Sequence, residues 1–278
     1  MKLAFSSLAC PSYNVDKLIH MAKACGFDGI ELRTLENTIN LWELEDFYPH
    51  NLSATSSKFK EAGLPVIVIG TSISFAKPEL KHRDNQFQIL RKFCEIAQGL
   101  CCPYLRVFGG PVPEGQTYEE VLERDINNYK TAVDMANTYG IKLLFETHDD
   151  FSTSDTILPL LKGIDKEVGI IWDILHPYRF GEPMEVTCKN LMPYINHVHI
   201  KDSFTYSEKG FDMALPGQGN NPITLALSLL KNSGYNGYLC FEWEKYWHPE
   251  IVEAHISLPY FINYLNHYRL KPVGSVSC

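Results

Sequence analysis

Lys142-Leu143-Leu144-Phe145-Glu146-Thr147 is the stretch that best shows how this chain folds. It is a short apolar run ending in polar residues, and it follows an amphipathic stretch over 118–139 and a break at Gly140. Apolar residues at helical spacing predict a helix, and a short apolar run bounded by turn residues predicts a strand. The same unit of helix, break and strand recurs along the chain.

The recurring units predict a parallel barrel. Eight strands are expected, at 3–8, 29–33, 66–71, 104–109, 142–147, 169–174, 197–201 and 238–242. Helical patterns between or after them include 15–25, 85–98, 118–139, 223–231 and 251–268. Eight alternating units predict a closed (β/α)₈ TIM barrel, and since no linker interrupts them we predict one domain over 1–278. The alternative is a doubly wound open sheet, but the glycine-rich turn usual after its first strand is missing from 7–13.

Composition narrows the class of protein further. The chain has 278 residues, of which 45% are hydrophobic and 21% charged, the profile of an ordinary soluble globular protein. Its 33 acidic and 25 basic residues, with a net charge of -8, argue against binding to nucleic acid. No apolar stretch approaches the roughly 20 residues that a membrane span requires. The eight cysteines form no Cys-x-x-Cys pair, so we expect reduced thiols and a cytoplasmic protein.

Two connections are longer than is usual in such barrels, at 34–48 and 202–221. Both follow strands, so we expect them on the face where barrel enzymes build their active sites. Long ordered loops commonly act as lids or binding loops. We therefore expect 202–221 to close over a substrate, with Gly210, Gly217 and Gly219 as hinges.

Polar side chains collect at the ends of the last four predicted strands. Because side chains alternate along a strand, one set shares the inward face: Glu146, His148, Asp173, His197, His199, Lys201, Glu242 and Glu244. One carboxylate or imidazole per strand thus converges on the barrel mouth. Glutamate, aspartate and histidine together form a mixed oxygen and nitrogen site for one divalent cation, Mn²⁺, Mg²⁺, Co²⁺ or Zn²⁺. The alternative is a network of structural ion pairs.

The spacing of Glu146, Asp173, His199 and Glu242, with Asp173-x-x-His176, resembles the xylose isomerase-like barrel superfamily. This superfamily includes ketose 3-epimerases, hydroxypyruvate isomerases, and inosose isomerases and dehydratases. The resemblance also covers Gly-Phe-Asp-Gly-Ile-Glu-Leu-Arg at 26–33 and Leu-Arg-Val-Phe-Gly-Gly at 105–110, and so nearly the whole chain. The resemblance is specific for the superfamily but says little about which substrate is used.

The resemblance implies a site and a reaction. The four residues would hold one metal ion, and the metal would coordinate two adjacent oxygens of a sugar or polyol ketone. Glu146 and Glu242 match the pair that transfers protons in the epimerase branch, and His176 matches a position that contacts a substrate oxygen. The chemistry is consistent, because a metal polarises a carbonyl and stabilises an enediolate while a carboxylate removes the adjacent proton.

Arg106, His148 and Lys201 are further candidates for binding substrate. Arg106 either binds a phosphate, carboxylate or hydroxyl of the substrate or pairs with Glu31 or Glu146. His148 and Lys201 lie one pleat above metal ligands, where they reach the far end of the substrate or support the ligands.

Two more acidic residues have open roles. We expect Glu244 to pair with Lys201, two residues beyond the last ligand. Glu31 and Arg33, at the end of the second strand, either neutralise each other or bind substrate.

Other functions remain open beside the metal-dependent isomerase or epimerase. An inosose-type dehydratase would use the same site. An endonuclease IV-like enzyme needs additional histidines that 67–71, 106–109 and 202–219 lack. A non-catalytic sugar-binding barrel is the third possibility. The substrate, the native metal and whether the chain forms a homo-oligomer stay undecided.

Overall fold

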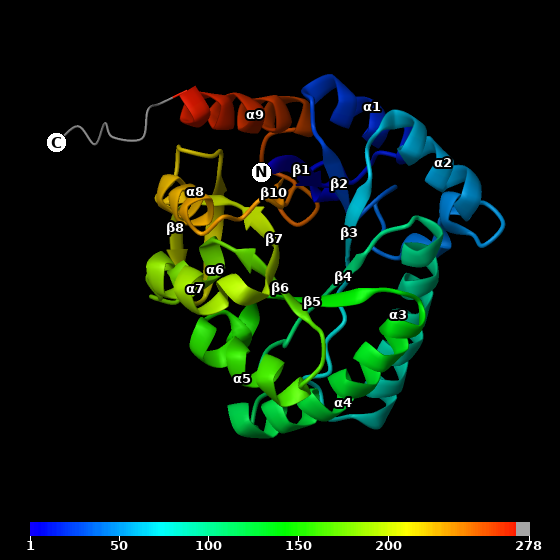
Figure 1. Cartoon of the computed structure of the whole chain (residues 1–278), viewed down its shortest axis with the longest axis vertical. Helices are drawn as coiled ribbons and strands as arrows, with labels where there is room; N and C mark the ends of the chain where they lie inside the picture. The colour runs from blue at the N-terminus through cyan, green and yellow to red at the C-terminus, as the bar shows by residue number, and fades with distance from the viewer. Residues whose placement is uncertain (271–278) are drawn as a thin grey trace.

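The strands close into a parallel barrel (Figure 1). The structure is a computed structural model that describes residues 1–270. Cys278, one of the eight cysteines expected to be reduced, lies outside the described residues. Its barrel strands are β1 (Lys2–Ser6), β2 (Gly29–Leu32), β3 (Val66–Gly70), β4 (Tyr104–Val107), β5 (Lys142–Glu146), β6 (Gly169–Asp173), β7 (Ile195–Ile200) and β10 (Tyr238–Phe241). Around the barrel they follow the order β1-β10-β7-β6-β5-β4-β3-β2. The predicted (β/α)₈ TIM barrel is confirmed.

Helices surround the barrel. They are α1 (Val15–Cys25), α2 (Leu52–Ala62), α3 (Leu80–Gly99), α4 (Tyr118–Thr138), α5 (Ser154–Ile164), α6 (Leu175–Arg179), α7 (Met184–Leu191), α8 (Ile223–Asn232) and α9 (Ala254–Leu270). α3 begins at Leu80 rather than at 85, because its first turn is largely exposed and shows no apolar periodicity. Within residues 1–270, no helix combines the length and apolar character that crossing a membrane requires.

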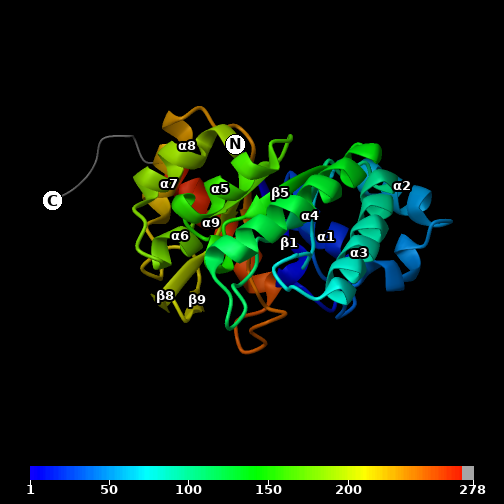
Figure 2. The same cartoon turned by 90° about the horizontal axis from the view of Figure 1, so that it is seen from below.

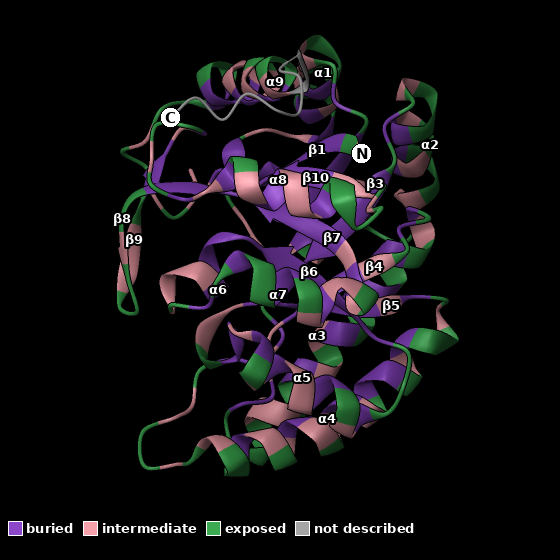
Figure 3. Ribbon diagram, turned by 60° about the vertical axis from the view of Figure 1, so that its left-hand side comes forward, coloured by how far each residue is buried: buried purple, intermediate pink, exposed green. Residues whose placement is uncertain are grey.

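Two groups of apolar side chains fill the interior. A small group lies inside the barrel and consists of Ala4, Ile67, Val68, Leu144, Ile171 and Cys240. A much larger group lies between strands and helices and includes Val198, Ile200 and Phe241. Figure 3 shows the barrel strands almost wholly buried beneath helices whose outer faces are exposed. Alternate residues of β7 and β10 thus point to opposite sides, and His199 and Glu242 are left on the barrel side.

The long segment after β7 is a hairpin rather than a loop. β8 (Asp202–Ser207) pairs with β9 (Gly210–Ala214) in antiparallel fashion, and Figure 2 shows the pair projecting beside α6. Short strands of this kind have too little apolar alternation to stand out in the sequence. The other long connection contains two short 3₁₀ helices, η2 (Leu41–Glu43) and η3 (Glu45–Phe47).

Asp202 ties down the base of this hairpin. Its carboxylate accepts hydrogen bonds from the backbone amides of Gly217, Gly219 and Asn221 at 2.8–3.1 Å. A Cβ at Gly219 would lie 2.3 Å from Asp202 Oδ1, so only glycine permits this close approach. Gly217 and Gly219 were expected to be hinges, but their amides anchor the segment to Asp202.

Candidate active site

The four predicted metal ligands meet at the carboxyl ends of neighbouring strands. Glu146 and Asp173 are the last residues of β5 and β6. His199 lies one residue before the end of β7, and Glu242 directly follows β10. The four side chains are 0–3% exposed, and one ligand atom from each lies within 4.8 Å of the other three. The strand ends therefore assemble three carboxylates and one imidazole into a single buried cluster.

His199 is held between two sets of carboxylates. Its Nδ1 lies 3.0 Å from Glu146 Oε1 and 3.4 Å from Glu242 Oε2. Its Nε2 lies 2.8 Å from Glu31 Oε2 on the opposite side of the ring. Burial acts to lower the pKa of His199, but the charges of Glu242, Glu31 and Glu146 outweigh it and raise the pKa well above its ordinary value. With no cation bound, a protonated His199 balances these carboxylates.

Lys201 compensates the acidic cluster from one side. Its Nζ is fully buried and lies 2.9 Å from Asp173 Oδ2 and 2.6 Å from Glu242 Oε2. It also contacts Glu244, the predicted pairing. Burial acts to lower the pKa of Lys201, but these carboxylates outweigh it and raise the pKa well above its usual value. Lys201 is thus a permanent cation within the cluster.

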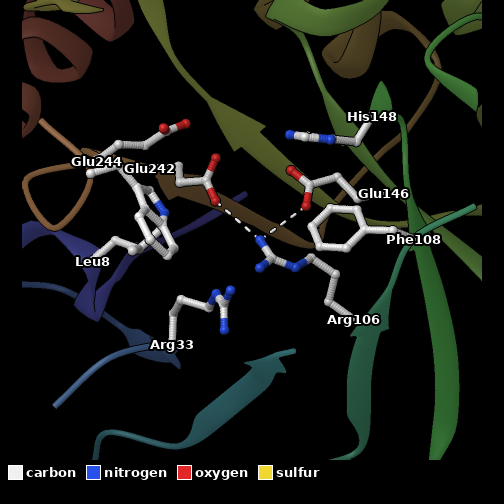
Figure 4. Close-up of a pocket in the computed structure, with 9 residues that line it drawn as sticks. Leu8, Arg33, Arg106, Phe108, Glu146, His148, Glu242 and Glu244 are labelled. Atoms are coloured by element: carbon white, nitrogen blue, oxygen red, sulfur yellow. Dashed lines mark hydrogen bonds and ion pairs between the residues drawn. The ribbon is translucent and has the colours of Figure 1, made fainter. Parts of the chain in front are cut away.

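Arg106 compensates the cluster from the other side. Its terminal nitrogen Nη1 lies 2.9 Å from Glu146 Oε2 and 3.2 Å from Glu242 Oε1, and so bridges the two carboxylates (Figure 4). Its Nη2 donates to the carbonyl of Thr71. Burial acts to raise the pKa of Glu146, but the charges of Arg106 and His199 outweigh it and lower the pKa. Both glutamates are therefore held ionised.

A cavity of about 210 Å³ opens onto these groups. It is lined by Leu8, Arg33, Arg106, Phe108, Glu146, His148, Glu242, Glu244 and Trp247 (Figure 4). Its size is small beside the roughly 300–1,000 Å³ of typical ligand pockets, and so suits a small molecule. Of the four predicted substrate-binding residues, Arg106 and His148 line this cavity. Lys201 and His176 are buried and are not among its lining residues.

The rings of His176 and His148 are in contact at the edge of the cluster. Their rings lie 4.3 Å apart, edge to face. His176 Nδ1 accepts a hydrogen bond from Arg179 Nε at 3.1 Å, and its Nε2 lies 3.6 Å from Asp173 Oδ2. Burial and the positive charges nearby hold the pKa of His176 well below its ordinary value. His176 is therefore neutral, and its Nε2 faces the metal-ligand cluster.

Glu31 and Arg33 do not pair with each other. Glu31 is fully buried and contacts His197 at 3.2 Å and His199 at 2.8 Å. Arg33 donates instead to neutral groups at and beyond the end of β3. Strand parity indicates that Glu31 faces into the barrel, but no sequence signal identifies a histidine on β7 as its partner. The structure thus adds Glu31 to the site as the support of a predicted ligand.

This donor set fits a divalent cation. Three carboxylates and an imidazole are ligands that Mn²⁺, Co²⁺ and Zn²⁺ accept. The fit extends beyond the ligands, because metal-binding histidines usually donate their second ring nitrogen to a carboxylate, as His199 Nε2 does to Glu31. That hydrogen bond leaves Nδ1 aimed at Glu146 and Glu242, where it would coordinate the ion.

Comparison with known proteins identifies the family. A family model described as xylose isomerase-like TIM barrel matches residues 19–259. The uncharacterized protein MJ1311 of Methanocaldococcus jannaschii is 28% identical over 224 residues, 74% of this chain and 75% of that protein. An inosose isomerase of Halalkalibacterium halodurans is 22% identical over 253 residues, 87% of each chain.

A solved structure agrees in fold. The crystal structure of the IolI protein with a zinc atom bound has a TM-score of 0.82 at 19% identity, and the match covers 96% of this chain and 98% of that one. The family model spans most of the chain and the barrel has the matching architecture. This chain therefore belongs to the xylose isomerase-like TIM-barrel family.

Proposed function

We propose that this protein is a divalent-metal-dependent isomerase or epimerase of a small sugar or polyol ketone. One observation carries the proposal. Glu146 and Glu242 both line the cavity, and both belong to the group of four donors whose ligand atoms lie within 4.8 Å of one another. A carboxylate that faces substrate next to a metal ligand set is suited to moving a proton beside a carbonyl.

Glu146, Asp173, His199 and Glu242 would hold the cation. When bound, the ion supplies a Lewis acid that polarises a carbonyl oxygen and stabilises developing negative charge. The zinc bound in the similar IolI structure supports a divalent metal at this site.

The two glutamates divide the proton transfer between them. One removes a proton from the carbon next to the carbonyl, and a planar enediolate follows. The other relays a proton from solvent to the same intermediate, at the neighbouring carbon or on the opposite face, and the first then releases its proton to solvent, so that both carboxylates return to the ionised state. Arg106 Nη1 lies 2.9 and 3.2 Å from the two carboxylates, and so bridges them and keeps them ionised between turnovers. The pKa values of both carboxyls are lowered, so both are ionised before substrate binds and either has a free lone pair for a proton.

The test is proton exchange with solvent. Metal-loaded enzyme is incubated in D₂O with ketoses, inososes and hydroxypyruvate, and ¹H NMR reports which carbon exchanges its proton. Exchange at one carbon of one compound supports the proposal and identifies both substrate and position. Conversion without solvent deuterium would reject the two-carboxylate mechanism, because a direct hydride shift retains the substrate hydrogen.

The same spectra separate a dehydratase from an isomerase. A dehydratase would also remove the proton beside the carbonyl but would expel a hydroxyl, so the product would lose water and gain a vinylic or methylene signal. An isomer of unchanged composition is the expected result.

A further inference from the structure

Arg33 is a buried cation on the cavity wall without an acidic partner. It lies at the end of β2, is 3% exposed and lines the cavity. Its guanidinium donates to the carbonyl of Gly70 at 3.5 Å and to Ser72 Oγ at 2.5 Å, and forms no ion pair within residues 1–270. Its Nε has no hydrogen-bond partner in that part of the chain. Burying an unpaired charge costs free energy, so a cation kept here needs an anion from elsewhere.

A glycine makes room for this arginine beside a second one. Gly70 ends β3, between the strands that carry Arg33 and Arg106. A Cβ at this position would lie 2.9 Å from Arg33 Cδ and 3.4 Å from Arg106 Cζ. Two guanidinium groups therefore pass closely over one strand end. In Figure 4, Arg33 lies on the side of Arg106 away from Glu146 and Glu242.

The two arginines differ in what neutralises them. Arg106 contacts two carboxylates, whereas the partners of Arg33 among residues 1–270 are neutral. Burial and the charge of Arg106 lower the pKa of Arg33 to about 9, which still leaves it protonated at neutral pH. Three carboxylates line the same cavity, but Arg33 forms an ion pair with none of them, so its guanidinium keeps donors for a bound anion.

We propose that Arg33 binds an anionic group of the substrate, a carboxylate or phosphate, at the end remote from the reacting carbons. The substrate is then an acidic ketone rather than a neutral sugar. A planar guanidinium binds such groups through two parallel hydrogen bonds. This inference rests on the proposed function, which assigns the reacting carbons to Glu146 and Glu242.

Binding of unreactive probes tests the inference without turnover. The probes are D-gluconate and D-glucitol, which differ by a carboxylate in place of a hydroxymethyl group, and D-glucitol 6-phosphate. Titration calorimetry of the metal-loaded protein measures each affinity. We expect gluconate or glucitol 6-phosphate to bind about 10- to 100-fold more tightly than glucitol, as charge-assisted hydrogen bonds predict. The tighter of the two anions identifies carboxylate or phosphate as the natural group.

Substitution assigns the preference to one residue. Arg33→Met should weaken binding of the anions about 10- to 100-fold and change glucitol binding less than about threefold. Arg33→Lys keeps the charge without the planar fork and should fall between. The matched control is Arg124→Met, because Arg124 also donates to neutral oxygens and has an unpartnered Nε, but does not line the cavity. It should leave all three affinities unchanged.

Two results would overturn the inference: equal affinity of the wild type for gluconate, glucitol 6-phosphate and glucitol, or equal weakening of all three by Arg33→Met. If Arg33→Met does not fold, the inference is still tested by the preference of the wild type for the two anions over glucitol and by the affinities of Arg33→Lys. An anion preference that depends on Arg33, with no ketone exchanging its proton in D₂O, would leave the anion site standing while the proposed function fails. If neutral ketoses exchange their protons with solvent and the protein shows no preference for anions, the proposed function stands and the anion site is rejected.

Discussion

The two halves of the barrel mouth carry opposite charges. β5, β6, β7 and β10 are neighbours in the barrel, and they supply the three carboxylates and the imidazole of the candidate metal site. β2 and β4 flank β3 on the other side, and they supply Arg33 and Arg106. The carboxylates of the acidic half are compensated by Lys201 and His199 of the same half and by Arg106 of the basic half. Arg33 differs from Arg106 in this respect, because it forms no ion pair within the described residues 1–270.

This difference separates two tasks. A compensated group of acids and bases can hold a cation and exchange protons while remaining stable in the absence of substrate. A buried charge without a partner stabilises the complex only when a ligand brings the opposite charge, and so selects the ligand. We expect the acidic half to govern turnover and metal binding, and the basic half to govern substrate choice.

The largest expected effect is on proton transfer. Glu146→Gln and Glu242→Gln each keep a ligating oxygen but lose basicity, so each should lower kcat about 10²- to 10⁴-fold. Deuterium incorporation into product measures the loss, with metal content determined for each variant. Glu244→Gln is the control, because Glu244 lines the same cavity outside the ligand group, and it should cost far less. Equal losses in all three variants would remove the distinction between Glu244 and the proton-transferring pair.

Removing a ligand should remove the metal. We expect the purified wild type to contain about one metal ion per chain. His199→Ala or Asp173→Ala removes one of the four donors and leaves the charge of the ion poorly compensated, so these variants should contain little metal. Elemental analysis after dialysis measures the content. His82→Ala, on α3 outside the ligand group, should retain full occupancy. Full occupancy in the two ligand variants would instead show that the ion binds elsewhere.

Glu31 should affect the metal without touching it. Glu31→Gln removes the charge that Nε2 of His199 faces at 2.8 Å, and loss of such partners typically weakens metal binding about 10- to 100-fold. Glu31→Asp keeps the charge and should recover part of the affinity. Titration of the metal into the metal-free protein gives the values. An unchanged affinity in Glu31→Gln would make Glu31 a purely structural partner of His197.

Metal affinity should fall as the pH falls. Burial acts to lower the pKa of His199, but Glu242, Glu31 and Glu146 outweigh it and raise the pKa above its ordinary value of 6.5. Below the raised pKa, a cation must displace the proton of Nδ1, so affinity drops by about tenfold per pH unit; above it, the dependence disappears. Calorimetry between about pH 6 and about pH 9 follows the change. An affinity independent of pH in this range would contradict a protonated His199 in the metal-free protein.

The smallest expected effect concerns the hairpin. Phe211 of β9 lies 5.6 Å from the ring of His176 and 5.2 Å from Lys201 Nζ, so β8 and β9 pack over the acidic half. If the hairpin closes over substrate, limited proteolysis at its tip should slow a few-fold when metal and substrate are present. Cleavage at an unchanged rate with every compound that the enzyme converts would rule out closure.

Much of the barrel and of the acidic half could be predicted from the sequence. Period-two alternation decides which side of a strand each residue faces, and the eight recurring units decide that the strands close into a ring. One ligand-type residue at the end of each of the last four strands then follows, because strand ends of a parallel barrel share one face. Glu146 and His199 were expected to converge in this way and lie 3.0 Å apart, and Glu244 contacts Lys201 as expected.

The hairpin and its anchor were missed for a physical reason. Asp202 is held by backbone amides of residues 15 to 19 positions further along the chain, and such contacts leave no periodic trace. From the sequence alone, Gly217 and Gly219 are equally consistent with a flexible hinge and with a close approach of the backbone to another group.

The sequence by itself determined the barrel, the grouping of acidic side chains at its mouth and the family that they resemble, because these depend on local periodicity and on the order of the strands. Only the tertiary structure decided the partners. Glu31 and Arg33 are two residues apart on one strand and were open to mutual pairing, but Glu31 binds histidines of β7 while Arg33 extends over Gly70 of β3. Which charged side chains contact each other depends on which strands are neighbours and on where a glycine leaves space for a side chain. The spacing of residues along one strand reveals neither.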